Sequence, residues 1–343
     1  MNSCAPQDMD GLNAPSFQNP RFVFSRRSAY LTVLFLSFGF LLSVTRIYGE
    51  SPDYKNYESF FDLLRDQGLS AVYDYRFEPG FTTIGIILTT LFSANAVVYS
   101  CIVAGSMLLK GSVISSLSSS GSIVIIVMIF YISRYYPFHE LTQLRAASAI
   151  GLLMVALTFF WRAHTFYGVL ACAGALLFHM SAAAMFPTLL FQPTKRWQVI
   201  VLGFGAFSLV LTAGNFISNY LGNYIAVFSE YQIAGYGDVA PNPLSAPLLL
   251  DWLMIAVSLT LWDLLSLSMK RIVFIQIIGM AIFYGAFDFP VIAHRIREMY
   301  SVFWIFFVAD GMRVKTMRIP AGGFVVASIG LYSYFFIFGT FFE

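Results

Sequence analysis

The sequence predicts an all-α, polytopic integral membrane protein with about eleven transmembrane helices. Of its 343 residues, 58% are hydrophobic and only 11% are charged, whereas a soluble domain carries about 25% charged residues. The mean hydropathy is +0.73. Apolar runs of about 17–25 residues, long enough to cross a bilayer as helices, recur from residue 28 to the C-terminus.

The apolar runs form one membrane domain over residues 28–343. The first 27 residues are a polar, proline-containing tail, which we expect in the cytoplasm without fixed structure. No small-residue cleavage site follows the first run, so it is predicted to be retained as a span. The runs lie at 28–46, 82–109, 122–138, 141–161, 165–193, 197–213, 247–268, 272–287, 291–309 and 320–341.

The orientation follows from the basic residues, because cytoplasmic loops are enriched in lysine and arginine. Lys110 and Arg162 are expected to mark two short cytoplasmic loops. All the basic clusters can face the cytoplasm only if 165–193 crosses the membrane an even number of times, turning near His179. The N-terminus is then inside and the C-terminus outside. The clusters are Arg21/Arg26/Arg27, Lys195/Arg196, Lys270/Arg271 and Arg313/Lys315/Arg318.

Two longer loops are expected on the outer face, at about 47–81 and 214–246. In the first, Ser51 and Pro52 favour a helix start, since proline suits the first helical position. Aromatic and aliphatic residues then recur at helical spacing, as in a helix at the membrane surface. The second loop is rich in Tyr, Asn and Gly. That composition fits sugar contact, and it also fits an ordinary interfacial aromatic belt.

The cations that this topology places outside are nearly all arginines. Arginine has a planar fork that suits phosphate and does not readily lose its charge. Several lie close to or within apolar spans, where a positive residue indicates function. The outer cations are Arg46, Lys55, Arg65, Arg76, Arg134, Arg145, Arg295 and Arg297.

Arg145 is the most informative of them, because it lies about one turn inside the predicted helix 141–161. That helix begins at the outer face, so its N-terminus and Arg145 can address the same anion. The alternative is that Arg145 pairs with Glu140 or another acid and only holds helices together.

Other kinds of site are not indicated. The three cysteines have no paired spacing, and the sequence contains neither a glycine-rich nucleotide loop nor a His-Glu-x-x-His zinc pattern. We expect no cofactor, no resident metal and no nucleic-acid partner.

Five segments occur in order along residues 45–310: YGESPDYKNYESFF, FEPGF, LTQLRAASAIGL, LLFHMSA and AHRIREMY. In this order the chain resembles the EpsG/Wzy-like family of bacterial polysaccharide polymerases. The resemblance implies a GT-C-like bundle in the inner membrane with its active site on the periplasmic or outer face. It also implies that lipid-linked oligosaccharide repeats are joined into O-antigen, capsule or exopolysaccharide, with release of undecaprenyl pyrophosphate. A chain-length regulator is a possible partner.

The resemblance also implies site residues. Glu78, Arg145, His179 and Ser181 match family positions, as do Arg295 and Tyr300. Here the His179 motif is soon followed by Pro187 and by Gln192-Pro193, so the helices of 165–193 are expected to be short.

The expected chemistry assigns roles to these residues. The departing pyrophosphate needs preorganised cations, for which Arg145 and Arg295 are candidates, with three further arginines as helpers. A carboxylate or imidazole must take the proton of the acceptor hydroxyl. The full set comprises Glu78, His179 and Asp53 as candidate bases, Arg145, Arg295, Arg134, Arg297 and Arg76 for pyrophosphate, and Tyr57 and Tyr300 for sugar.

Simpler interpretations remain open. Glu78 could form a salt bridge with Arg76 at the start of a helix, and His179 could be a hydrogen-bonded residue at a helix break. A flippase of the lipid-linked unit or another outer-face transferase, such as a ligase, would use a similar anion site. The flippase is less favoured, because no convincing internal repeat is present and the charges cluster toward one face.

Overall fold

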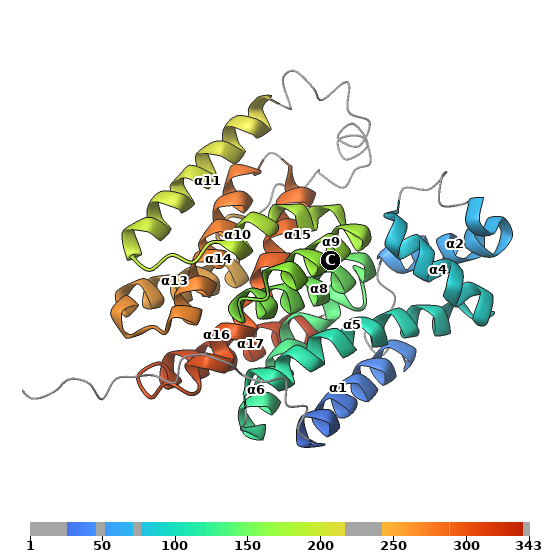
Figure 1. Ribbon diagram of the computed structural model, residues 1–343, viewed down its shortest axis with the longest axis horizontal. Coiled ribbons are helices and arrows are strands. Elements are labelled where there is room, and N and C mark those ends of the chain that lie inside the picture. The colour runs from blue at the N-terminus through green and yellow to red at the C-terminus, as the bar shows by residue number, and fades with distance from the viewer. Residues whose placement is uncertain are drawn as a thin grey trace, which may run out of the picture.

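The computed structural model describes residues 26–45, 52–70, 77–118, 120–216, 242–287 and 289–338, and within these ranges every regular element is a helix. This confirms the predicted all-α class. Four helices are long and apolar enough to cross a membrane: α5 (Asn95–Leu117), α8 (Leu144–Trp161), α11 (Arg196–Phe216) and α14 (Leu267–Gly285). Shorter apolar helices accompany them, and Figure 1 shows their arrangement.

The remaining elements are mostly short, because prolines and residues with non-helical backbone interrupt the apolar runs. They are α1 (Arg26–Thr45), α2 (Pro52–Gln67), η2 (Gly68–Ser70), α4 (Pro79–Leu91), α6 (Gly121–Arg134), α7 (Tyr136–His139), α9 (Thr165–Phe178), η3 (Met180–Ala184), α10 (Phe186–Leu190), α13 (Ala246–Thr260), η5 (Trp262–Leu264), α15 (Pro290–Ser301), α16 (Trp304–Gly311) and α17 (Arg318–Ile337).

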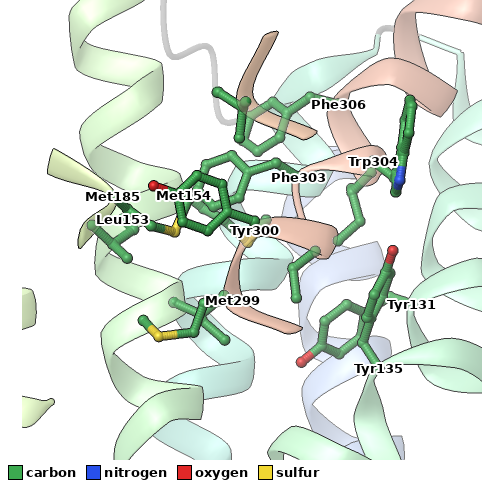
Figure 2. Packing of buried hydrophobic residues seen from close by; sticks show 14 of the residues in the cluster. Tyr131, Tyr135, Leu153, Met154, Met185, Met299, Tyr300, Phe303, Trp304 and Phe306 are labelled. Carbon is green, nitrogen blue, oxygen red and sulfur yellow. The ribbon is translucent and has the colours of Figure 1, made fainter. Parts of the chain in front are cut away.

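The centre of the bundle is α16, a helix whose residues are all buried. The ring of Trp304 packs against Phe307 and Phe324, with centroids 5.2 Å away in both pairs. Figure 2 shows Tyr300 and Phe303, from α15 and the turn that follows it, beside methionines of neighbouring helices. A helix that is apolar on all sides belongs in the interior of a bundle, and α16 takes that position.

Two helix boundaries expected from the sequence are confirmed. Helix α2 begins at Pro52, as the Ser-Pro pair indicates. Its apolar residues are buried, and α2 packs on α4 and α5. Helix α9 ends before His179, whose extended backbone breaks the segment into α9 and the short elements η3 and α10.

The prediction of a short loop at Lys110 is wrong. Helix α4 ends at Leu91, helix α5 starts at Asn95, and α5 continues through Lys110 to Leu117. Lys110 is fully buried and forms an ion pair with Glu140. The run 82–109 is therefore two helices. A lysine can remain inside a span when a carboxylate of another helix neutralises it.

Several basic segments lie together at one end of the bundle. Trp262 donates to the carbonyl of Thr194 at 3.2 Å, which brings the chain before α14 next to the Lys195/Arg196 cluster. Ser268, beside Lys270 and Arg271, donates to Asp310 at 2.5 Å, near the start of the Arg313/Lys315/Arg318 cluster. We call this the basic end.

The ion pair between Lys110 and Glu140 gives a stability prediction. Lys110→Met leaves the Glu140 charge buried without its cation, so it should destabilise the protein by about 3–5 kcal/mol. Adding Glu140→Gln in the double variant should recover most of that loss. Thermal unfolding of wild type and the two variants in detergent measures this. A double variant no more stable than Lys110→Met would contradict the assignment.

Candidate active site

Away from the basic end, the carboxylate of Glu78 joins three segments of the chain. Arg145 Nη1 donates to Glu78 Oε2 at 2.8 Å. His179 Nδ1 lies 3.2 Å from Glu78 Oε1, and the backbone N–H of Met180 donates to the same oxygen at 3.0 Å. The start of α4, the first turn of α8 and the break after α9 thus meet at one carboxylate.

The sequence Glu78-Pro79-Gly80 explains why the carboxylate lies there. Glu78 is the N-cap residue of α4, and Pro79 begins the helix. A Cβ added to Gly80 would lie 2.7 Å from the carbonyl oxygen of Leu177, so only glycine lets α4 approach α9 this closely. The close approach places Glu78 beside His179.

The side chain of Arg145 is held by its neighbours but is not fully buried. Its guanidinium lies over the ring of Phe77, 4.1 Å from the ring centroid. Its side chain remains 19% exposed, against 9% for the Glu78 side chain. Arg145 is the second residue of α8, so it projects from the helix N-terminus. The acid it pairs with is Glu78, since Glu140 pairs with Lys110.

Helix α2 brings two further candidates to this cluster. Asp53 lies within electrostatic range of Arg145 and Arg295. Tyr57 is buried, and it too interacts with Arg145. We call Asp53, Tyr57, Glu78, Arg145, His179 and Arg295 the Glu78 cluster. Six residues predicted from five separate parts of the sequence are therefore neighbours.

The two acids of the cluster differ in their affinity for a proton. Burial alone would raise the pKa of Glu78, but the hydrogen bond from His179 and the charge of Arg145 outweigh it and hold the pKa at about 2. Burial raises the pKa of Asp53, and the charges of Arg295 and Arg145 oppose that rise. Glu78 is therefore an ionised partner at neutral pH and a weak base.

Arg134 and Arg297 belong to a different cluster. Arg134 Nη2 donates to Asp251 Oδ1 at 2.5 Å, and Arg297 donates to the other oxygen of the same carboxylate. Arg134 also donates to Ser328 at 3.1 Å, and its guanidinium lies among the rings of four aromatic residues. We call this the Asp251 cluster. It ties α6, α13, α15 and α17 together.

Two features were not predicted from the sequence. One is Asp251, and the other is a hydrogen bond between residues that flank the two clusters. Gln143, the N-cap residue of α8, donates from Nε2 to Glu298 Oε2 at 3.0 Å. An acid within an apolar run, facing several intramembrane arginines, is the signal that could have identified Asp251. Nothing in the spacing identifies the pairing of Gln143 with Glu298.

The last predicted residues lie elsewhere. Tyr300 is buried in the core (Figure 2), where its hydroxyl donates to the carbonyl of Ala184 at 2.6 Å. Arg76 and most of the loop 214–246 lie outside the described residues. Within the described part of the chain, no three metal-binding side chains gather in one place.

One comparison with known proteins identifies a relationship. The family model described as EpsG family matches residues 28–343. No curated protein and no solved structure matches the chain significantly. The match covers both the Glu78 cluster and the Asp251 cluster.

The low pKa of Glu78 predicts a pH dependence. An acid whose folded pKa lies below its ordinary value of 4.5 stabilises the fold above that pH, and the contribution is lost as the pH falls toward about 2. The melting temperatures of wild type and Glu78→Gln should therefore differ most near neutrality and converge as the pH falls from about 4.5 to about 2. A difference independent of pH would contradict an ionised Glu78.

Proposed function

The chain belongs to the EpsG family and is an integral membrane protein, and we propose that it polymerises undecaprenyl-pyrophosphate-linked oligosaccharide repeats. The reaction takes place at the outer face of the bacterial inner membrane. The observation that carries this proposal is the partly exposed guanidinium of Arg145, which lies beside an imidazole and a buried carboxylate.

The orientation is supported by the basic end. Since cytoplasmic segments are enriched in Lys and Arg, the end that carries the lysine and arginine clusters faces the cytoplasm. Helix α8 runs from Arg145 in its first turn to Trp161, which packs against Phe306, four residues before Asp310 at the basic end. The Glu78 cluster then faces the periplasm or cell exterior, where lipid-linked repeats are joined.

In the reaction, a hydroxyl of the acceptor sugar attacks the anomeric carbon of the donor. A C–O bond forms, the bond from that carbon to the pyrophosphate oxygen breaks, and undecaprenyl pyrophosphate leaves with the bonding pair. Arg145 and Arg295 stabilise the developing negative charge. Arg145 can do so because Glu78 takes the Nη1 group of its guanidinium and its side chain remains 19% exposed.

His179 is the base that the geometry favours. An ionised Glu78 only accepts hydrogen bonds, so Nδ1 of His179 carries the proton and Nε2 keeps its lone pair. Nε2 has no hydrogen-bond partner among the described residues. Glu78 then orients the imidazole and balances the charge it gains, as carboxylates do in catalytic triads. Asp53 is the alternative base within the same cluster.

A flippase or a ligase would handle the same lipid-linked donor. The three functions differ in what accumulates when each is lost. Without a polymerase, single repeats still reach the outer face. Without a ligase, finished chains stay on the lipid, and without a flippase no repeat reaches that face.

Arg145 is tested by the length of the glycan. Arg145→Ala and Arg145→Lys should each reduce polymerisation by about 10²–10³-fold, because removing one transition-state donor has that effect. The glycan ladder on a gel should shorten to one repeat while the protein still inserts. Arg65→Ala is the matched control, since Arg65 pairs with Asp62 on an exposed turn. A normal ladder from Arg145→Ala would remove this residue from the mechanism.

The base is tested in the same assay. His179→Ala should lower the rate by about 10²–10⁴-fold, as expected for loss of a general base. Glu78→Gln should cause a smaller loss, because the imidazole remains but is no longer oriented by a carboxylate. The control is His164→Ala, an exposed histidine at the start of α9. Full activity of His179→Ala would leave Asp53 as the base.

A further inference from the structure

A polar cavity lies beside the Asp251 cluster, on the far side of α15 from Arg295. Its volume is about 250 Å³, and its walls come from α6, α7, α13, α15 and α17 and the turns that flank them. Arg295 and Arg297 are two residues apart on α15, so their side chains diverge by about 200° around the helix axis. Arg297 lines the cavity, while Arg295 interacts with the Glu78 cluster.

The wall of the cavity combines aromatic rings with polar and charged groups, among them Arg134, Arg297 and Glu298. Tyr135, Phe138 and Tyr332 supply ring faces, and His294 and Glu298 supply donors and acceptors. The ring of Tyr135 is fixed, because its hydroxyl donates to the carbonyl of Ser301 at 2.7 Å. Rings that offer apolar faces beside hydrogen-bonding groups suit a sugar, which has an apolar face and a rim of hydroxyls.

The arginines of this cavity are poorly placed to bind pyrophosphate. Both oxygens of Asp251 are occupied by Arg134 and Arg297, and the side chain of Arg134 is fully buried. Binding a diphosphate there would break a buried ion pair, which costs several kcal/mol. Arg145 is instead partly exposed. The ligand of the cavity is therefore neutral, unlike the leaving group at the Glu78 cluster.

The two sites are connected through a single hydrogen bond. Glu298 lines the cavity and accepts from Gln143, and Gln143 lies two residues before Arg145. A molecule that touches Glu298 thus contacts a residue linked to the first turn of α8. The wall of the cavity is therefore bonded to the N-cap residue of the helix that carries Arg145.

We propose that this cavity holds one sugar ring of the acceptor repeat, while the donor pyrophosphate binds at Arg145. The proposal rests on the proposed function, which requires two saccharides to meet at one base. At about 250 Å³ the cavity is smaller than the 300–1,000 Å³ of sites for drug-sized ligands, so it takes one ring and leaves the rest of the repeat outside.

The test uses full-length protein in nanodiscs and two probes. One is the repeat oligosaccharide freed from its lipid pyrophosphate by mild acid, and the other is inorganic pyrophosphate. Ser245→Phe fills the cavity from its rim, and Ser245→Ala is the matched control, because the Ser245 side chain makes no capping hydrogen bond. Oligosaccharide binding should weaken at least about tenfold in Ser245→Phe and less than about twofold in Ser245→Ala.

A second variant keeps the test informative if Ser245→Phe does not fold. Glu298→Gln keeps the volume of the side chain and should weaken oligosaccharide binding at least about fivefold, since a charged acceptor is lost. Arg145→Ala should bind the oligosaccharide as wild type does, and it should no longer bind inorganic pyrophosphate. The proposal is overturned if wild type does not bind the oligosaccharide, if both cavity variants bind it normally, or if Arg145→Ala loses both probes. Failure of the polymerase function shows separately, as a full glycan ladder in cells that lack the protein.

Discussion

The bridge that Glu78 forms between Arg145 and His179 is the interaction on which the candidate site depends. A carboxylate this buried is tolerated only when its oxygens are satisfied, and here a guanidinium, an imidazole and a backbone N–H do so. The same bonds fix the start of α4 against α8 and the break after α9. The same carboxylate therefore positions the guanidinium of Arg145 and orients the imidazole of His179.

Arginines near apolar spans divide here into two kinds, and the neighbouring carboxylate determines which kind each is. Asp251 engages two guanidiniums at once and closes them into a buried cluster that joins four helices. Among the residues that the structure describes, Glu78 pairs with one guanidinium, that of Arg145, and leaves part of it exposed. A buried, saturated arginine stabilises packing, whereas a partly exposed one retains capacity for an anion. On these grounds Arg134 and Arg297 hold helices together, and Arg145 is the arginine that we propose to bind the substrate pyrophosphate, with Arg295 beside it.

The sequence predicts the helical class and these local helix boundaries well, because both depend on short stretches of residues. The start of α2 at Pro52 and the break at His179 follow from neighbouring residues alone. Lys110 could not be placed, because its position within α5 depends on Glu140, which is thirty residues away and becomes its neighbour only after folding. Likewise, the sequence offers Arg295 as a main candidate for the pyrophosphate and Arg134 and Arg297 as helpers at the same site. Only the rotation of α15 and the position of Asp251 separate them.

A structure of the full-length protein with undecaprenyl pyrophosphate bound tests the central claim most directly. The account predicts phosphate oxygens at hydrogen-bond distance, about 2.7–3.2 Å, from the guanidinium nitrogens of Arg145 and Arg295, with Asp251 still paired to Arg134 and Arg297. A pyrophosphate held by Arg134 and Arg297, with Arg145 contacting only Glu78, would contradict it.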